Sequence, residues 1–228
     1  SAQSDNAPGN TTGKAGSLAK YSVGGPNNNY LYSVSNTEII VTDITDVTRP
    51  VNVQRVEINA WWQVETVFPF NDKLLLGTEA GMLVYDIGQD PTIPQYIGQF
   101  EHIRGCDPVV AEGNYAYVTL RGNGMCGAAQ DELHVLDISD LENPVLIHSY
   151  GMEEPYGLGV DGNLLFVCDG NAGLKVYDVS EPTMGLELIH TFPEINAKDV
   201  IPHNGLLLLI GDDGFYQYSY KDGKVEFL

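Results

Sequence analysis

Apolar side chains alternate with polar or small ones along most of this chain, as in "LLFVCD" at 164–169 and "LKVYDV" at 174–179. Successive side chains of an extended strand point to opposite faces, whereas an amphipathic helix repeats its apolar positions about every 3.6 residues. Turn-forming residues such as Gly162 and Asn163 separate the runs, and they accept the backbone angles of tight turns. The pattern therefore predicts short antiparallel strands and not helices.

One phrase recurs along the chain: an apolar strand, an aspartate and a turn that contains proline. Its four copies are "IIVTDITDVTRP" at 39–50, "MLVYDIGQDP" at 82–91, "LHVLDISDLENP" at 133–144 and "GLKVYDVSEP" at 173–182. The copies lie about 40 to 50 residues apart, a repeat length typical of propellers and related arrays. The longest interval holds the glycine-rich stretch "RGNGMCGAAQDE" at 121–132, which we interpret as an insertion in one loop.

Each repeat contains four strand-like runs, and their alignment divides the chain into five units. These cover about 17–57, 62–100, 105–150, 155–192 and 196–228. A single twisted sheet cannot bury both of its faces, so such units stack in a line or close into a ring. Both end units carry apolar strands and no polar cap, which favours closure. We predict an all-β fold: a five-bladed β-propeller of four-stranded antiparallel blades, whose first strands line the central channel.

The first 16 residues consist almost entirely of small and polar side chains. Burial of such side chains cannot offset the entropy lost on ordering. We therefore expect a flexible N-terminal leader at 1–16, followed by a single β-propeller domain at 17–228. A tether of this kind is common in secreted or lipid-anchored proteins.

The aspartates that end the recurring strands are Asp43, Asp86, Asp137 and Asp178. An aspartate at the start of a turn often accepts hydrogen bonds from backbone N–H groups two or three residues later. We interpret all four as turn formers and not as catalytic groups.

The units resemble LVIVD repeats, on the strand phrases "IIVTDI", "LVYDI", "HVLDI" and "KVYDV" with their proline-containing turns. The third and fourth units are similar to LVIVD-repeat proteins exported by bacteria of the Bacteroidetes type. The fifth unit departs from the pattern, because "YQYSYKDG" replaces the aspartate and its proline turn. The resemblance implies a β-propeller in an extracytoplasmic location, in the periplasm or on the cell surface, with a lipid anchor through the leader as an alternative. It implies no particular activity.

Charge narrows the choice of partners. The chain contains 11 Lys and Arg against 31 Asp and Glu, a net charge of −20. A surface of this sign repels nucleic-acid phosphates and anionic lipid headgroups. The longest apolar run, "GLLLLIG" at 205–211, is far shorter than the roughly 20 residues of a membrane span. We expect no nucleic acid and no membrane insertion.

Three cysteines are present: Cys106, Cys126 and Cys168. Propeller topology brings the loops that hold Cys106 and Cys126 to the same rim of the third unit. We predict a disulfide between them, which requires an oxidising compartment; two free thiols or two metal ligands are the alternatives. Cys168, at the end of an apolar strand, fits a small buried hydrophobe.

Candidate chemistry gathers where the inner strands begin. Their alignment brings Glu65, Asp107 and Asp199 from three units to one mouth of the channel. Converging carboxylates suit Ca²⁺, which takes oxygen ligands, or the acid and base of glycoside hydrolysis. They also suit plain solvation or ion pairs with Lys198, Arg104 and Arg121. The same face carries Trp61 and Trp62, of which one or both can pack in the core or bind a ligand.

The sequence contains no HExxH or GxSxG motif and no phosphate-binding loop. Our main hypothesis is a non-catalytic exported binding module of the cell envelope, without a required cofactor, that recognises an envelope protein or a glycan. Its expected binding residues are Trp61, Trp62, Arg104, Asp107, Arg121, Tyr156 and Asp199. The alternative is a carbohydrate-active hydrolase that uses Glu65, Asp107 and Asp199. A structural repeat unit within a larger envelope assembly is a third hypothesis.

Overall fold

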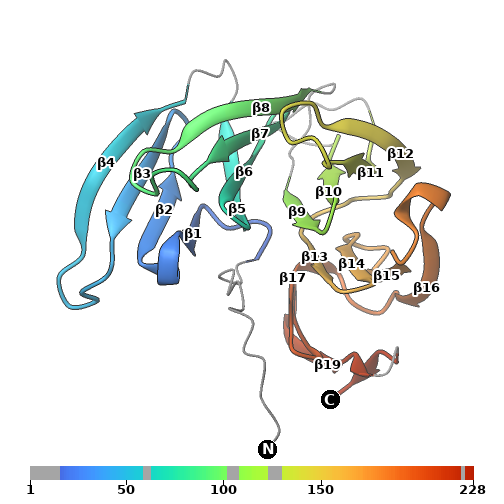
Figure 1. Ribbon diagram of the computed structural model, residues 1–228. Coiled ribbons are helices and arrows are strands. Elements are labelled where there is room, and N and C mark those ends of the chain that lie inside the picture. Colours follow the sequence, from blue (N-terminus) through green and yellow to red (C-terminus); the bar gives the residue numbers. More distant parts are fainter. Residues whose placement is uncertain (1–15, 59–62, 102–107, 123–129, 222–223) are drawn as a thin grey trace, which may run out of the picture.

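The computed structural model describes residues 16–58, 63–101, 108–122, 130–221 and 224–228 (Figure 1). These residues form five separate antiparallel sheets of four strands, and in every sheet the strands lie in sequence order. The predicted all-β fold of five four-stranded blades is therefore confirmed. Each sheet is called a blade below, numbered from one to five along the chain.

The strands of the first three blades are as follows. Blade one contains β1 (Tyr21–Gly24), β2 (Tyr30–Val34), β3 (Glu38–Asp43) and β4 (Val51–Glu57). Blade two contains β5 (Val64–Phe70), β6 (Lys73–Thr78), β7 (Gly81–Asp86) and β8 (Gln95–Glu101). Blade three contains β9 (Val109–Glu112), β10 (Tyr115–Leu120), β11 (Glu132–Asp137) and β12 (Val145–Gly151).

The last two blades follow the same order. Blade four contains β13 (Leu158–Asp161), β14 (Leu164–Cys168), β15 (Leu174–Asp178) and β16 (Glu187–Phe192). Blade five contains β17 (Ala197–His203), β18 (Leu206–Gly211), β19 (Gly214–Ser219) and β20 (Glu226–Phe227). Two single turns of 3₁₀ helix, η1 (Pro26–Asn28) and η2 (Pro182–Met184), lie in connecting loops.

The recurring aspartates are turn formers, as predicted. Each accepts a hydrogen bond at Oδ1 from the backbone N–H two residues later: Thr45 to Asp43 (2.8 Å), Gly88 to Asp86 (2.7 Å), Ser139 to Asp137 (2.9 Å) and Ser180 to Asp178 (2.7 Å). Hydrogen bonds from the backbone and side chains of Thr45 and Ser139 favour the carboxylate form and lower the pKa of Asp43 and Asp137; for Asp178 the side chain of Ser180 contributes most to the lowered pKa and its backbone N–H adds to the effect. The repeated phrase therefore encodes the turn from the third to the fourth strand of a blade.

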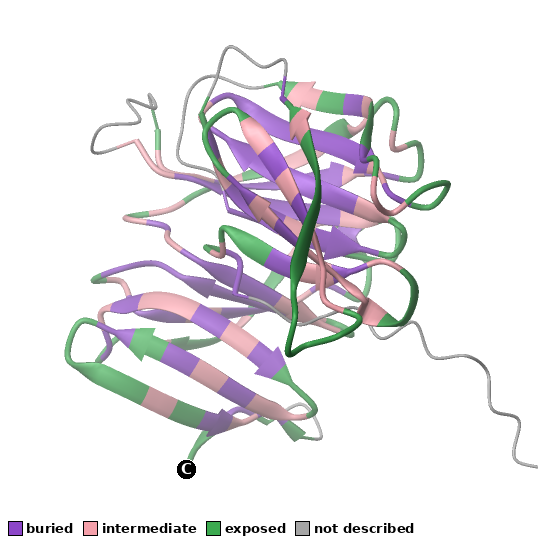
Figure 2. Cartoon of the chain, turned by 90° about the vertical axis from the view of Figure 1, so that its left-hand side faces the viewer, coloured by how far each residue is buried: buried purple, intermediate pink, exposed green. Residues whose placement is uncertain are grey.

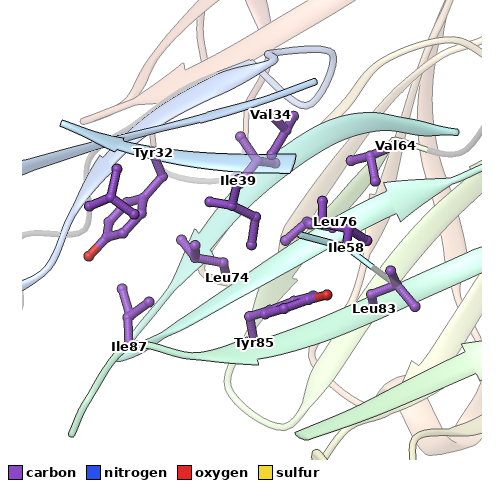
Figure 3. Packing of buried hydrophobic residues seen from close by; sticks show 12 residues of the cluster. Tyr32, Val34, Ile39, Ile58, Val64, Leu74, Leu76, Leu83, Tyr85 and Ile87 are labelled. Atoms are coloured by element: carbon purple, nitrogen blue, oxygen red, sulfur yellow. The ribbon is translucent and has the colours of Figure 1, made fainter. Parts of the chain in front are cut away.

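The hydrophobic core lies between neighbouring blades. Between blades one and two, Tyr32 and Ile39 pack against Leu74, Leu76 and Tyr85 (Figure 3). Similar clusters join blade two to three, three to four and four to five. Because a middle blade contributes to two clusters, it buries both faces of its sheet, which explains why its second strand, as in β6 and β14, is almost continuously apolar.

The blades follow one another along an arc, and one side of the arc is open. Consecutive blades contact each other through their inner strands, as β1 does with β5 and β13 with β17. No contact of similar extent joins blade one to blade five among the described residues. Figures 1 and 2 show the opening between these two sheets. The sequence predicted that the fifth unit packs back on the first, and the structure differs from this expectation.

The chain enters blade one through a short segment that crosses the inner strands of other blades. The backbone carbonyl of Ala19 accepts a hydrogen bond from the N–H of Val67 in blade two (2.9 Å). The hydroxyl of Ser17 accepts a hydrogen bond from the N–H of Leu158 in blade four (2.8 Å). The segment of residues 16–19 therefore ties inner strands that lie far apart in the sequence.

Candidate functional site

Three consecutive blades bring Arg121, Tyr156 and Lys198 together. The guanidinium carbon of Arg121 lies 4.3 Å from the centroid of the Tyr156 ring, and Nζ of Lys198 lies 3.9 Å from the same centroid. Cations are attracted to the electron-rich face of an aromatic ring at such distances. The sequence predicts Arg121 and Tyr156 as binding residues, and it predicts Lys198, like Arg121, as an ion-pair partner of the carboxylates at the channel mouth.

Tyr156 is held on all sides by hydrogen bonds. Its phenol donates to Oε1 of Glu154 (2.8 Å), and its backbone carbonyl accepts from the hydroxyl of Thr119 in blade three (2.6 Å). Its backbone N–H donates to the carbonyl of Cys168 (2.7 Å). The ring therefore has a defined position for the two cations.

The loop before Tyr156 is anchored by a buried carboxylate. Asp169 is fully buried and accepts hydrogen bonds from the backbone N–H groups of Glu153 (3.0 Å) and Glu154 (2.8 Å). Its other oxygen accepts from Nζ of Lys175 (2.6 Å). A buried charge needs such partners to offset its lost hydration. Asp169 thus holds the loop that positions Tyr156. No sequence motif had indicated this role.

The two cations of the site differ in their surroundings. Burial disfavours the charge of Lys198, but the Tyr156 side chain and the carboxylates of Asp212 and Glu154 outweigh it and raise its pKa. Nε of Arg121 is buried and has no hydrogen-bond partner in the described part of the chain. An unpaired buried donor carries a desolvation cost, which distinguishes Arg121 from the well-paired Lys198.

Asp199 lies deeper than the sequence predicted. Its Oδ1 accepts hydrogen bonds from the hydroxyl of Ser17 (3.3 Å) and from the backbone N–H of Val200 (2.9 Å). Burial raises the pKa of Asp199 to about 6, and these hydrogen bonds oppose the rise. A Cβ atom at Gly16 or Gly157 would clash with its carboxylate, and at Gly157 it would also lie 3.0 Å from the Cα of Asp199, so a side chain at either position would displace the carboxylate.

Several predicted site residues have other outcomes. Glu65 is half-buried beside a register shift of β5, between Val64 and Thr66. Six predicted residues lie outside the described part of the chain: Trp61, Trp62, Arg104, Asp107, Cys106 and Cys126. Their predicted roles, including the disulfide between Cys106 and Cys126, stay predictions. Cys168 is a fully buried free thiol, as expected.

The part of the chain that the structure describes contains no group of three or more His, Cys, Asp or Glu arranged to hold a metal ion. Asp107 is not in that part, so a calcium site that includes Asp107 stays a prediction. Within the same residues, no helix has the length and apolar character needed to cross a membrane.

A pocket of about 280 Å³ lies among the inner strands of blades two to five, and the sequence analysis missed it. Phe68, Val110, Val160 and other apolar residues form its walls. The polar residues Asn71, Glu112 and Asp161, at the ends of three inner strands, complete the lining. Asp161 also accepts a hydrogen bond from the phenol of Tyr220. In the sequence, the apolar wall residues cannot be distinguished from ordinary core residues. The polar residues Asn71, Glu112 and Asp161, which recur at the ends of three inner strands, are the sequence feature that indicates the pocket.

Comparison with protein families finds LVIVD repeats at residues 106–151 and 157–188. These ranges include most of blades three and four, the two units in which the sequence resemblance was most evident. The chain therefore contains LVIVD repeats. No curated protein matches it in sequence.

Solved structures with the same fold are only distantly related in sequence. The periplasmic gluconolactonase PpgL of Pseudomonas aeruginosa is 15% identical with a TM-score of 0.64, over 89% of this chain and 67% of that one. BamB from Moraxella catarrhalis is 8% identical with a TM-score of 0.61, over 86% of this chain and 55% of that one. A functionally unknown protein from Desulfotomaculum acetoxidans is 10% identical with a TM-score of 0.71, over 95% and 68%.

These similarities show the fold alone, because all three identities are low. The chain spans between 55% and 68% of the length of these three structures.

Proposed function

We propose that this LVIVD-repeat β-propeller is a non-catalytic, exported binding module of the cell envelope that recognises a carboxylate-bearing glycan. The observation that carries the proposal is the convergence of Arg121 and Lys198 on the Tyr156 ring. Both side chains carry a positive charge, so a ligand carboxylate that contacts either of them is attracted electrostatically. The guanidinium of Arg121 and the ammonium of Lys198 are the donors that a ligand carboxylate can bond.

The negative net charge of the protein restricts where an acidic ligand can bind. A net charge of −20 repels polyanions in general, so an acidic ligand binds only where local cations outweigh the surrounding field. A glycan also presents hydroxyl groups, and the carboxylates of Glu154 and Asp212 beside the cations can accept hydrogen bonds from them. Trp61, Trp62, Arg104 and Asp107 belong to the same proposed face on the sequence evidence.

The test is calorimetric titration with an oligogalacturonate, with neutral maltohexaose as the control ligand. We expect the acidic oligosaccharide to bind, and Arg121→Ala or Lys198→Ala to weaken binding at least about tenfold, which corresponds to about 1.4 kcal/mol. Arg49→Ala, a change of an exposed arginine in blade one, should leave binding unchanged. Equal binding of the neutral oligosaccharide would contradict the role of the cations. Cell fractionation tests the proposed location.

Hydrolysis of a sugar lactone or glycoside is a second candidate. Two observations favour it: the fold is shared with a protein described as a gluconolactonase, and the pKa of Asp199, about 6, suits a carboxyl group that donates and accepts protons near neutral pH. Glu65 and Asp107 would complete the acid and base groups. Turnover of gluconolactone or nitrophenyl glycosides that Asp199→Asn and Glu65→Gln abolish would favour this candidate over plain binding.

A further inference from the structure

The burial pattern of the second strand of a blade shows whether one or both faces of that sheet are covered. In β6, β10 and β14 every residue after the first is buried, so both faces of these sheets are packed. In β18 buried residues alternate with less buried ones: Leu207 and Leu209 are fully buried, whereas Ile210 is 55% exposed. Blade five is therefore covered on one face only.

The open face of blade five carries a group of large apolar side chains. Leu206 and Leu208 are half-buried on this face, and Ile210 pairs with Phe215 of β19, which is 59% exposed. We call these four residues the blade-five face. A sheet face that meets water normally carries polar side chains, so the sequence of β18, "LLLLIG", has the composition of a strand covered on both sides.

Repeat equivalence indicates what covers the blade-five face. Leu208 and Ile210 occupy the positions in β18 that Phe166 and Cys168 occupy in β14. Phe166 and Cys168 are fully buried because they pack against the next blade of the chain. By the same geometry, the blade-five face can pack against one sheet face of a following blade.

The charge pattern agrees with this partner. The four residues of the blade-five face are uncharged, although the protein carries a net charge of −20. Gln217 and Ser219, which pair with Leu208 and Leu206, are neutral too. The charged residues on this side of the sheet are Asp199, whose carboxylate accepts a hydrogen bond from Ser17, and Glu226 on the edge strand β20. A charged partner surface would lose its hydration against this face without compensation. An uncharged apolar sheet would not.

The opposite end of the arc has a matching open face. Tyr21 in β1 is 63% exposed, and Leu31 and Ile40 beside it are only half-buried. The opening between blades one and five is thus flanked by two sheet faces (Figure 2). Solved propellers that share the fold are longer than this chain, which spans 55% to 68% of them, and propellers have typically about 4 to 8 blades.

We infer that the opening is a docking site for further propeller blades of the same type, four-stranded sheets with apolar uncharged faces, which pack on the blade-five face and complete the ring. This inference does not depend on the proposed glycan site, which lies on blades three to five where their inner strands begin.

The test supplies such blades. A second copy of residues 102–192, which holds the consecutive blades three and four, is attached after Leu228. Hydroxyl-radical footprinting then measures the exposure of Phe215, with the exposed Tyr96 of β8 as the internal reference. We expect labelling of Phe215 to fall several-fold and the melting temperature to rise, while labelling of Tyr96 stays constant. The same extension with Ile210→Asp should leave Phe215 labelled. Unchanged labelling of Phe215 in a folded extended protein would overturn the inference.

If the extended protein does not fold, two measurements on the chain without the extension test whether the blade-five face is free to bind further blades. Light scattering should give the monomer mass of 24.9 kDa; a dimer that Ile210→Asp dissociates means that a second copy covers the face, and overturns the inference. The apolar dye bis-ANS should bind, and Ile210→Asp with Phe215→Asp should reduce the signal more than Val47→Asp does at an exposed valine of blade one. Absence of dye binding would also overturn it.

Discussion

The hydroxyl of Ser17 donates a hydrogen bond to the carboxylate of Asp199 (Oγ to Oδ1, 3.3 Å) across 182 positions of the chain. The same hydroxyl accepts a hydrogen bond from the N–H of Leu158 (2.8 Å). One small side chain thus connects the segment before blade one to the inner strands of blades four and five. This connection matters because, among the described residues, no extensive strand contact joins the first blade to the last.

Replacement of Ser17 by alanine should destabilise the protein by about 1–3 kcal/mol, because it leaves the buried N–H of Leu158 without an acceptor. Ser22→Ala is the matched control: Ser22 is equally buried, and its hydroxyl has no hydrogen-bond partner within the described part of the chain. Its loss should be neutral or slightly stabilising. Urea unfolding measures both free energies; equal values for the two variants would disprove the role of Ser17.

Asp199 should make stability depend on pH. Its pKa in the folded protein, about 6, lies above its usual value of 3.8, so the folded state holds a proton that the unfolded chain releases. The free energy of unfolding contributed by this proton is fully present below about pH 4, falls as pH rises to about 6, and is constant above.

The variant Asp199→Asn tests this dependence. It keeps an oxygen acceptor but does not ionise, so its stability relative to the unmodified protein should increase by on the order of 2 kcal/mol between pH 4 and pH 7. Unfolding in urea at a series of pH values gives the difference. If both proteins show the same pH slope, Asp199 is not the group responsible.

Removal of the buried carboxylate in Asp169→Ala should cost about 3–5 kcal/mol, because it leaves the charge of Lys175 and two backbone N–H groups without their partner. Asp72→Ala, which removes the exposed partner of Lys73, should cost less than about 1 kcal/mol. Thermal unfolding compares them. Because Asp169 holds the loop before Tyr156, oligogalacturonate binding should weaken too.

Gly173 should not tolerate a side chain. Its φ is +90°, and a Cβ atom would lie 2.0 Å from the carbonyl oxygen of Phe192, so Gly173→Ala combines backbone strain with a clash and should cost well over about 2 kcal/mol. Gly113→Ala separates the two effects, since Gly113 has a φ of +60° and open space at its Cβ position; it should cost about 1 kcal/mol. Similar melting temperatures for both variants would contradict the clash.

Local features of this protein are readable in its sequence. The alternation in "LKVYDV" specifies a strand because side-chain direction depends on neighbouring residues alone. The turn at Asp178 is specified in the same way, by a hydrogen bond to a residue two positions away. The count of five blades follows from the repetition of these local signals, and so does the resemblance to LVIVD repeats.

Tertiary structure decided the rest. The arc stays open because closure depends on the angle between whole sheets, which no strand pattern contains. The sequence placed Arg121, Tyr156 and Lys198 near one mouth of the channel. Their contact at one ring centroid, the burial of Asp169 and the bond between Ser17 and Asp199 could not be predicted from it. These interactions join residues of different blades or distant turns, and their energies depend on distances that only the packed blades define.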